Sequence, residues 1–135
     1  MLKSPNRAVA TLVGAVYLLA GLLGFAVTLG VRLAAVTDGL LLGLFGADIV
    51  HSAAHLIVGF VLVVAGLSNT SAAKLASTFI GAGTLALGVV GFFILRDTFA
   101  GLALTSADNA LHFGSAVLLL AVGIVADNKS RAITI

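Results

Sequence analysis

The chain has 135 residues, of which 61% are hydrophobic and 9% are charged, and its net charge is +2. With a mean hydropathy of +1.25 and no cysteine, this composition is typical of an integral membrane protein, and it excludes disulfides, thiolate metal ligands and a cysteine nucleophile. The basic residues are scattered along the chain, so nucleic acid is not expected as a partner.

The first predicted element is a helix over residues 8–31, a stretch that contains no charged residue. Lys3 and Arg7 precede it, as basic residues precede the core of a secretory signal peptide. The apolar run is longer than the roughly 7 to 15 residues of such a core, and no small-residue cleavage site closes it. Because a bilayer-spanning helix needs about 20 apolar residues, we interpret this segment as a retained transmembrane helix.

Three further charge-poor stretches predict helices over residues 48–67, 75–95 and 108–126. The chain is therefore predicted to be an all-α bundle of four transmembrane helices that forms a single integral membrane domain, residues 1–135. The segment 33–47 is too apolar for a solvated loop and too short to cross the bilayer. We expect it to lie at the membrane interface or to form a shallow re-entrant loop.

The distribution of basic residues predicts how the bundle is oriented. Five of them fall on the side of the two termini and two on the opposite side: Lys3, Arg7, Lys74, Lys129 and Arg131 against Arg32 and Arg96. By the positive-inside rule, both termini are expected in the cytoplasm. The second and fourth helices would then begin near the outer face of the membrane.

The sequence also indicates that one helical hairpin is used twice. At an offset of 67, residues of the first helix recur in the third: Gly14, Ala15, Leu18, Gly21, Gly24 and Phe25 match Gly81, Ala82, Leu85, Gly88, Gly91 and Phe92. At an offset of 57, His55 matches His112 and His51 matches Asp108 in the second and fourth helices. Two hairpins in the same orientation form a parallel pseudo-repeat. Their recurring small residues predict close-packed helix faces.

All three histidines lie near an aspartate at the beginning of the second or the fourth helix. His51 and His55 are four residues apart and share one helix face, as do Asp108 and His112. Ionisable side chains within a membrane usually turn inward and have a function. If the two pairs face each other, all four side chains form a ligand set for a divalent metal such as zinc or copper. Asp48 would then orient one of the coordinating histidines.

A structural interpretation stands beside the metal site and is the one that the sequence favours. Asp48 and Asp108 occupy positions where helix N-caps belong, and hydrogen bonds from histidine between membrane helices contribute about 1 kcal/mol each. The cluster would then clamp the second helix to the fourth. The protein would be a structural or accessory subunit of a membrane complex, with other subunits or a second copy as partners.

Two other functions receive less support from the residues. A haem held by His55 and His112 is disfavoured because few aromatic residues surround them. No nucleophile stands beside a pair of oxyanion-stabilising donors, so no catalytic residues are assigned and an enzyme is not expected.

The motifs of both histidine-bearing helices resemble those of a family of small bacterial four-helix membrane proteins that is catalogued as a domain of unknown function. Residues 48–55 and Gly59 are similar to its second-helix pattern of Asn, two residues, His, Asn, two residues, His, and then Gly. Residues 107–112 match its fourth-helix pattern Ala-Asp-Asn-x-x-His. Asp48 and Ser52 stand where the family usually has asparagine. The resemblance implies the fold, a bacterial inner-membrane location and the position of the site, and it implies no activity.

Overall fold

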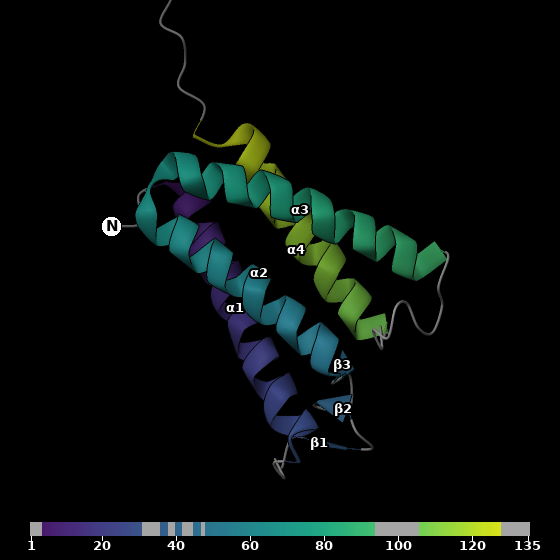
Figure 1. The fold of residues 1–135 in the computed structure, drawn as a ribbon. Helices are drawn as coiled ribbons and strands as arrows, with labels where there is room; N and C mark the ends of the chain where they lie inside the picture. The colour runs from purple at the N-terminus through teal and green to yellow at the C-terminus, as the bar shows by residue number, and fades with distance from the viewer. Residues whose placement is uncertain are drawn as a thin grey trace, which may run out of the picture.

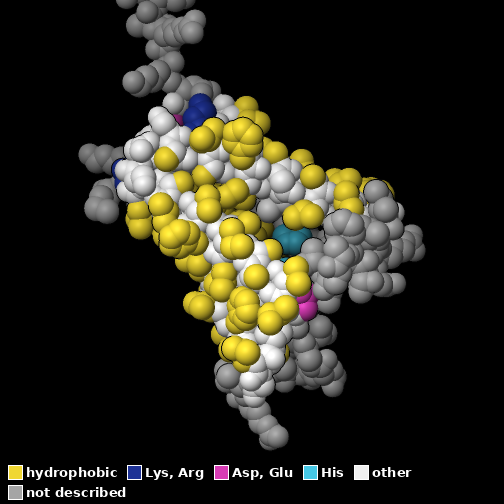
Figure 2. Space-filling model, in the orientation of Figure 1, with side chains coloured by type: hydrophobic (Ala, Val, Ile, Leu, Met, Phe, Trp, Pro, Cys, Tyr) yellow, Lys and Arg dark blue, Asp and Glu magenta, His cyan; other side chains and the backbone are white. Residues whose placement is uncertain are grey.

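The computed structural model describes residues 4–30, 36–37, 40–41, 45–46, 48–93 and 106–127. Its helices are α1 (Pro5–Thr28), α2 (Ile49–Ser68), α3 (Thr70–Phe93) and α4 (Ser106–Val125). All four contain a stretch that is long and apolar enough to cross a membrane. Figure 2 shows hydrophobic side chains spread over the face in view, which suits contact with lipid. The predicted all-α class with four membrane-length helices is therefore confirmed.

Side-chain caps determine where three of the helices begin. The Ser4 hydroxyl accepts the Arg7 N–H, the Asp48 carboxylate accepts the His51 N–H at 2.8 Å, and the Asn69 side chain accepts the Ala72 N–H at 2.9 Å. Asn69 is also the single residue that joins α2 to α3. The predicted bounds 8–31 and 75–95 start later than α1 and α3 because they were drawn at charged residues, whereas the caps lie N-terminal to those residues.

The four helices form two hairpins, α1 with α2 and α3 with α4. Helix contacts are far more extensive within each hairpin than between the hairpins. Figure 1 shows the hairpins close together where α2 ends and α3 begins, and diverging toward the end where α2 and α4 begin. A small core joins all four helices on the converged side: Ala10, Val13, Tyr17, Leu62, Ala73 and Leu119. The beginnings of α2 and α4 therefore face each other across a gap.

Packing within the two hairpins reproduces the repeat that the sequence predicts. Contacts made by glycines in the first hairpin recur in the second at the same two offsets: Gly14 lies against Leu62 as Gly81 lies against Leu119, and Gly66 lies against Thr11 as Gly123 lies against Thr78. A Cβ placed on Gly14 would lie 2.8 Å from the Leu62 Cβ, and one on Gly81 would lie 3.0 Å from the Leu119 Cβ. The small residues thus pack helices closely within each hairpin.

Most of the segment 33–47 lies outside the described residues, and so does its expected interfacial or re-entrant position. Its described parts are three short strands, β1 (Val36–Thr37), β2 (Leu40–Leu41) and β3 (Phe45–Gly46). They pair antiparallel in the order β1-β2-β3. This pairing satisfies backbone groups next to the membrane.

Polar side chains tie the N-terminal end of α1 to the ends of α2 and α4. The Arg7 guanidinium donates to the Gly66 and Leu67 carbonyls at 2.9 and 2.8 Å, which satisfies carbonyls left free at the end of α2. The Asn6 amide donates to the Asp127 carboxylate at 3.0 Å, and the Ser4 hydroxyl donates to the same oxygen. Arg7, one of the basic residues that predict the orientation, therefore also caps the end of α2.

Gly59→Ala is expected to destabilise the fold by about 1–3 kcal/mol, because the added methyl group would overpack the contact between α1 and α2. A Cβ on Gly59 would lie 2.6 Å from the Leu18 backbone nitrogen. Gly83→Ala is the matched control, since no atom lies within 4 Å of its Cβ position. Thermal unfolding of both variants in detergent, followed by circular dichroism, measures the difference. Equal melting temperatures would contradict the packing described.

Asp127→Asn is expected to change how the free energy of unfolding depends on pH. Hydrogen bonds from Ser4 and Asn6 hold the pKa of Asp127 below its ordinary 3.8. A pKa that is lower in the folded protein adds stability above about pH 4 and loses it as the pH falls through the folded value. Wild type should be the more stable protein at pH 7, and its advantage should vanish in strong acid. An advantage that is the same at every pH would contradict this assignment.

Candidate metal centre

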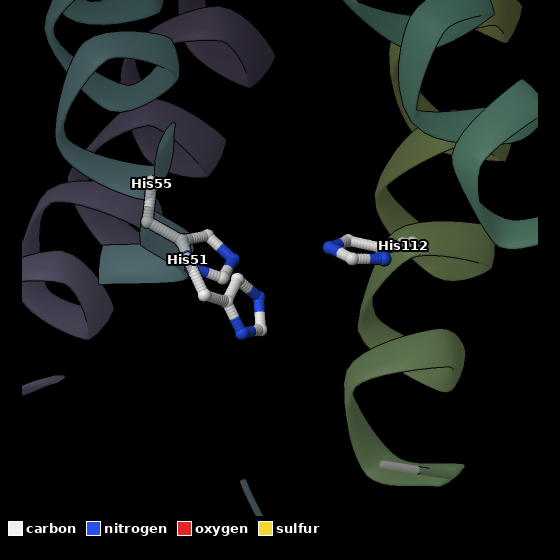
Figure 3. Close-up of side chains that lie close together, drawn as sticks. All are labelled: His51, His55 and His112. Atoms are coloured by element: carbon white, nitrogen blue, oxygen red, sulfur yellow. The ribbon is translucent and has the colours of Figure 1, made fainter. Parts of the chain in front are cut away.

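Three histidines converge across the gap between the two hairpins. His51 and His55 project from one face of α2, and His112 projects from α4 toward them (Figure 3). The ring centroids of His51 and His55 are 4.3 Å apart, and that of His112 lies 6.0 and 5.9 Å from them. Each residue is at most 6% exposed. The i, i+4 spacing on α2 and the parallel course of α4 are what bring the rings together.

The nitrogen atoms of these rings are arranged as a set of metal ligands. One ligand nitrogen from each histidine lies within 4.8 Å of the other two. Ligands about 2.0–2.1 Å from a tetrahedral zinc ion would lie about 3.3 Å apart, so small side-chain rotations would close the site. The His55 ring also forms a hydrogen bond with the backbone of His51. The Nε2 atom of His55 has no such partner and is available to an ion at the centre of the cluster. Such a backbone bond to the second ring nitrogen is usual for a metal-binding histidine.

Four imidazole nitrogens in the cluster are buried without a hydrogen-bond partner. They are Nδ1 and Nε2 of His51, Nε2 of His55 and Nδ1 of His112. A buried polar group left unpaired costs about 1–3 kcal/mol. The Thr84 hydroxyl, by contrast, donates to the Ile80 carbonyl at 2.9 Å, and the other unpaired buried atoms among the described residues are single ones: Asn6 Oδ1, Ser77 Oγ and Asn109 Oδ1. The histidine nitrogens therefore require a partner such as an ion or water.

The two aspartates lie on either side of His51. The Asp108 Oδ1 atom is 4.0 Å from His51 Nε2, and the Asp48 Oδ2 atom is 4.0 Å from His51 Nδ1. Asp108 is 1% exposed, whereas Asp48 is half-buried and caps α2. Of the ligand set predicted from sequence, the structure groups the three histidines and places Asp108 beside His51. Whichever His51 nitrogen binds an ion, the other has a carboxylate near it.

The imidazoles line a cavity of about 60 Å³. Its walls come from α1, α2, α3 and α4: Tyr17, His51, Ala54, His55, Val58, Thr84, Leu87 and His112. A volume of this size accommodates an ion with a few waters. It is far below the roughly 300–1,000 Å³ of pockets for larger ligands, so it does not suit a haem.

Tyr17 belongs to the site and was not identified from the sequence. Its ring centroid is 4.9 Å from that of His55, and its hydroxyl is 2.7 Å from the Ser115 Oγ atom. The Ser115 hydroxyl in turn reaches the His112 carbonyl at 3.1 Å. The signal available in the sequence was the repeat, since the offset of 67 pairs Tyr17, the one tyrosine of the chain, with Thr84.

Four membrane-length helices around a buried polar cluster define a small integral membrane protein. The chain belongs to the family described as "Domain of unknown function (DUF4383)", which matches residues 7–125. This range includes all three histidines and both aspartates of the cluster. No curated protein and no solved structure matches the chain. Family membership therefore agrees with the fold and leaves the chemistry to be argued from the site.

A double-mutant cycle with Tyr17→Phe and Ser115→Ala should give a coupling free energy of about 1 kcal/mol, because the hydroxyl pair joins α1 to α4 within the membrane. Each single variant should lower the melting temperature in detergent, and the double variant should melt close to the less stable single variant. Strictly additive effects would show that the two hydroxyls do not interact.

Proposed function

We propose that the protein binds one divalent transition-metal ion between its two hairpins, with His51, His55 and His112 as ligands. The observation that supports this most is the convergence of three almost fully buried imidazoles that retain four unpaired nitrogens. Three histidine ligands leave a fourth coordination position for water, Asp108 or another ligand. In this proposal the His51 nitrogen that does not bind the ion donates to the carboxylate beside it, which is Asp108 for Nε2 and Asp48 for Nδ1.

The donor set favours zinc or copper. Neutral imidazole suits zinc, copper, iron and nickel, and the Irving–Williams order gives copper(II) the highest affinity for nitrogen ligands. A divalent ion within a membrane also needs compensating charge. Asp108, at 4.0 Å from His51, and the half-buried Asp48 supply two carboxylates close to the site.

The clamp that the sequence favours receives less support from the contacts. A clamp would need hydrogen bonds from the imidazoles across α2 and α4. Within the described residues, hydrogen bonds between the hairpins run from Tyr17 to Ser115 and from Ser4 and Asn6 to Asp127, whereas His51 on α2 lies 4.0 Å from Asp108 on α4, beyond hydrogen-bond distance. We therefore place metal binding ahead of the clamp as the role of the cluster.

The wider setting of this function is also proposed. We infer a structural or accessory role in a membrane complex, through other subunits or a second copy, in which the ion joins the hairpins and no reaction is catalysed. The excess of basic residues near the termini supports a bacterial inner-membrane location with both termini in the cytoplasm. The metal centre would then lie toward the outer leaflet.

Chelator-treated protein in detergent should bind about one equivalent of zinc(II) or copper(II) and melt at a higher temperature when loaded. His112→Ala and the fold-preserving His55→Gln should each weaken binding at least about tenfold, since each removes one of three ligands. Asn109→Ala is the control, because Asn109 is on α4 but does not line the cavity. Mass spectrometry for bound metal and competition with a chromogenic chelator give both stoichiometry and affinity.

Two results would contradict the proposal. Wild type that binds no metal, with a His112→Ala variant that only melts earlier, would support the clamp instead. Equal metal affinity in wild type, His112→Ala and His55→Gln would place the ion elsewhere in the chain.

A further inference from the structure

The histidine cavity continues into an apolar groove between α2 and α3 that faces the lipid. We propose that this groove binds an uncharged single-chain lipid whose terminal hydroxyl or carbonyl oxygen reaches the histidines. The inference deepens the proposed function, because it assigns a class of molecule to the coordination position that three histidines leave open. It rests on the proposed function for that final contact with the ion and for the exclusion of a cationic headgroup.

The groove has the dimensions and lining of a site for a hydrocarbon chain. Its volume is about 540 Å³, and it follows one face of α3 from Phe79 through Gly83 and Leu87 to Val90. The eleven helical rises between Phe79 and Val90 add up to about 16 Å, which is comparable with an extended acyl chain of medium length. The one hydroxyl in its lining, that of Thr84, already donates to its own helix. The groove therefore offers a hydrocarbon chain dispersion contacts and leaves no polar group unpaired.

The groove meets the imidazoles partway along its length. Val58, Thr84 and Leu87 line both the groove and the histidine cavity, and Thr84 and Leu87 lie between Phe79 and Val90 on α3. In Figure 2 a histidine is visible at the bottom of a hollow bordered by hydrophobic side chains. A lipid whose chain occupies the groove on one side of this opening would thus present its polar end to the metal ligands without leaving the hydrocarbon region.

A second groove, of about 300 Å³, lies between α1 and α4 and is the repeat-related counterpart of the first. At the offset of 67, its residues on α1 correspond to those of the first groove on α3: Leu12, Val13, Val16 and Tyr17 to Phe79, Ile80, Gly83 and Thr84. The two grooves flank the histidine cavity in the pseudo-symmetric bundle. Comparing the two grooves shows which residues control the connection between each groove and the histidine cavity.

Tyr17 closes the second groove toward the imidazoles. Its ring is buried and its hydroxyl pairs with Ser115 at 2.7 Å, so that this groove meets the cavity only through Tyr17. The position equivalent to Tyr17 holds the smaller Thr84, and Thr84, Val58 and Leu87 line both the first groove and the cavity. Of the two grooves, the one along α3 therefore has the more open connection to the histidines.

Charge near the cavity selects an uncharged headgroup. Asp108 and Asp48 lie 4.0 Å from the two nitrogens of His51, and no Lys or Arg is among the residues that line the cavity. Two carboxylates repel an anionic headgroup, while the bound ion repels a cationic one. Passage through hydrocarbon adds a large cost for any charge. A neutral oxygen can coordinate the ion or form a hydrogen bond with an imidazole.

Photolabelling with a dodecanol derivative that carries a diazirine in its chain tests the proposal. The full-length protein is reconstituted in lipid nanodiscs, with and without zinc, and the labelled residues are mapped by mass spectrometry. Label is expected on α3 between residues 79 and 90. Excess dodecanol should remove it, whereas dodecanoate and dodecylamine should not.

A pair of glycine variants provides the control. Neither Gly83, in the first groove, nor Gly114, in the second, has any atom within 4 Å of its Cβ position, so a leucine fits at both. Gly83→Leu should fill the first groove and weaken competition by dodecanol about tenfold. Gly114→Leu should label and compete as wild type does.

Each outcome separates the lipid site from the metal site. Label spread over all four helices, or label that excess dodecanol does not remove, indicates ordinary boundary lipid and overturns the proposal. Label confined to the α1–α4 groove overturns it as well. If wild type binds no zinc but the α3 label is still displaced by dodecanol, the metal proposal fails and the lipid groove stands. If zinc binds and the label is unspecific, the metal proposal stands and the lipid groove fails.

Discussion

The account of this protein depends on one constraint: a polar group inside a membrane has no water to satisfy it. The chain meets that constraint at several places, since Arg7 caps the end of α2 and Thr84 donates back to its own helix. The histidine cluster concentrates the departures from it, with four of the seven unpaired buried side-chain atoms in the described structure. Such a departure is expected at a binding site, where a ligand supplies the missing partner.

The fold produces this site by packing tightly in one place and loosely in another. Glycines bring α1 onto α2 and α3 onto α4 at distances that no larger residue permits, so each hairpin behaves as a unit. The hairpins meet through a small core at one end and diverge at the other, where the helices that carry the histidines begin. The repeat places His55 and His112 in equivalent positions. Its breakdown at Tyr17 and Thr84 opens one side of the site and closes the other.

Much of this was predictable from residue types and spacing. Charge-free stretches predicted the helices, two constant offsets predicted the hairpin packing, and the i, i+4 spacing predicted which histidines share a face. Sequence could not place Tyr17 beside His55, because that contact depends on the register in which α1 packs against α2. It also grouped Asp108 with the three histidines, and the structure places the Asp108 Oδ1 atom 4.0 Å from His51 Nε2. The role of Arg7 as a cap was missed because its charge was used only as a helix boundary and for orientation. Asn69 was missed because the third helix was expected to begin after Lys74.

The most direct measurement is an experimental structure of zinc-loaded protein, with anomalous diffraction recorded on both sides of the zinc absorption edge. The account predicts one peak between α2 and α4, with nitrogens of His51, His55 and His112 about 2.0–2.1 Å from it. An empty gap in which the imidazoles instead donate to Asp108 or to backbone carbonyls would contradict it. So would a zinc peak bound by other residues.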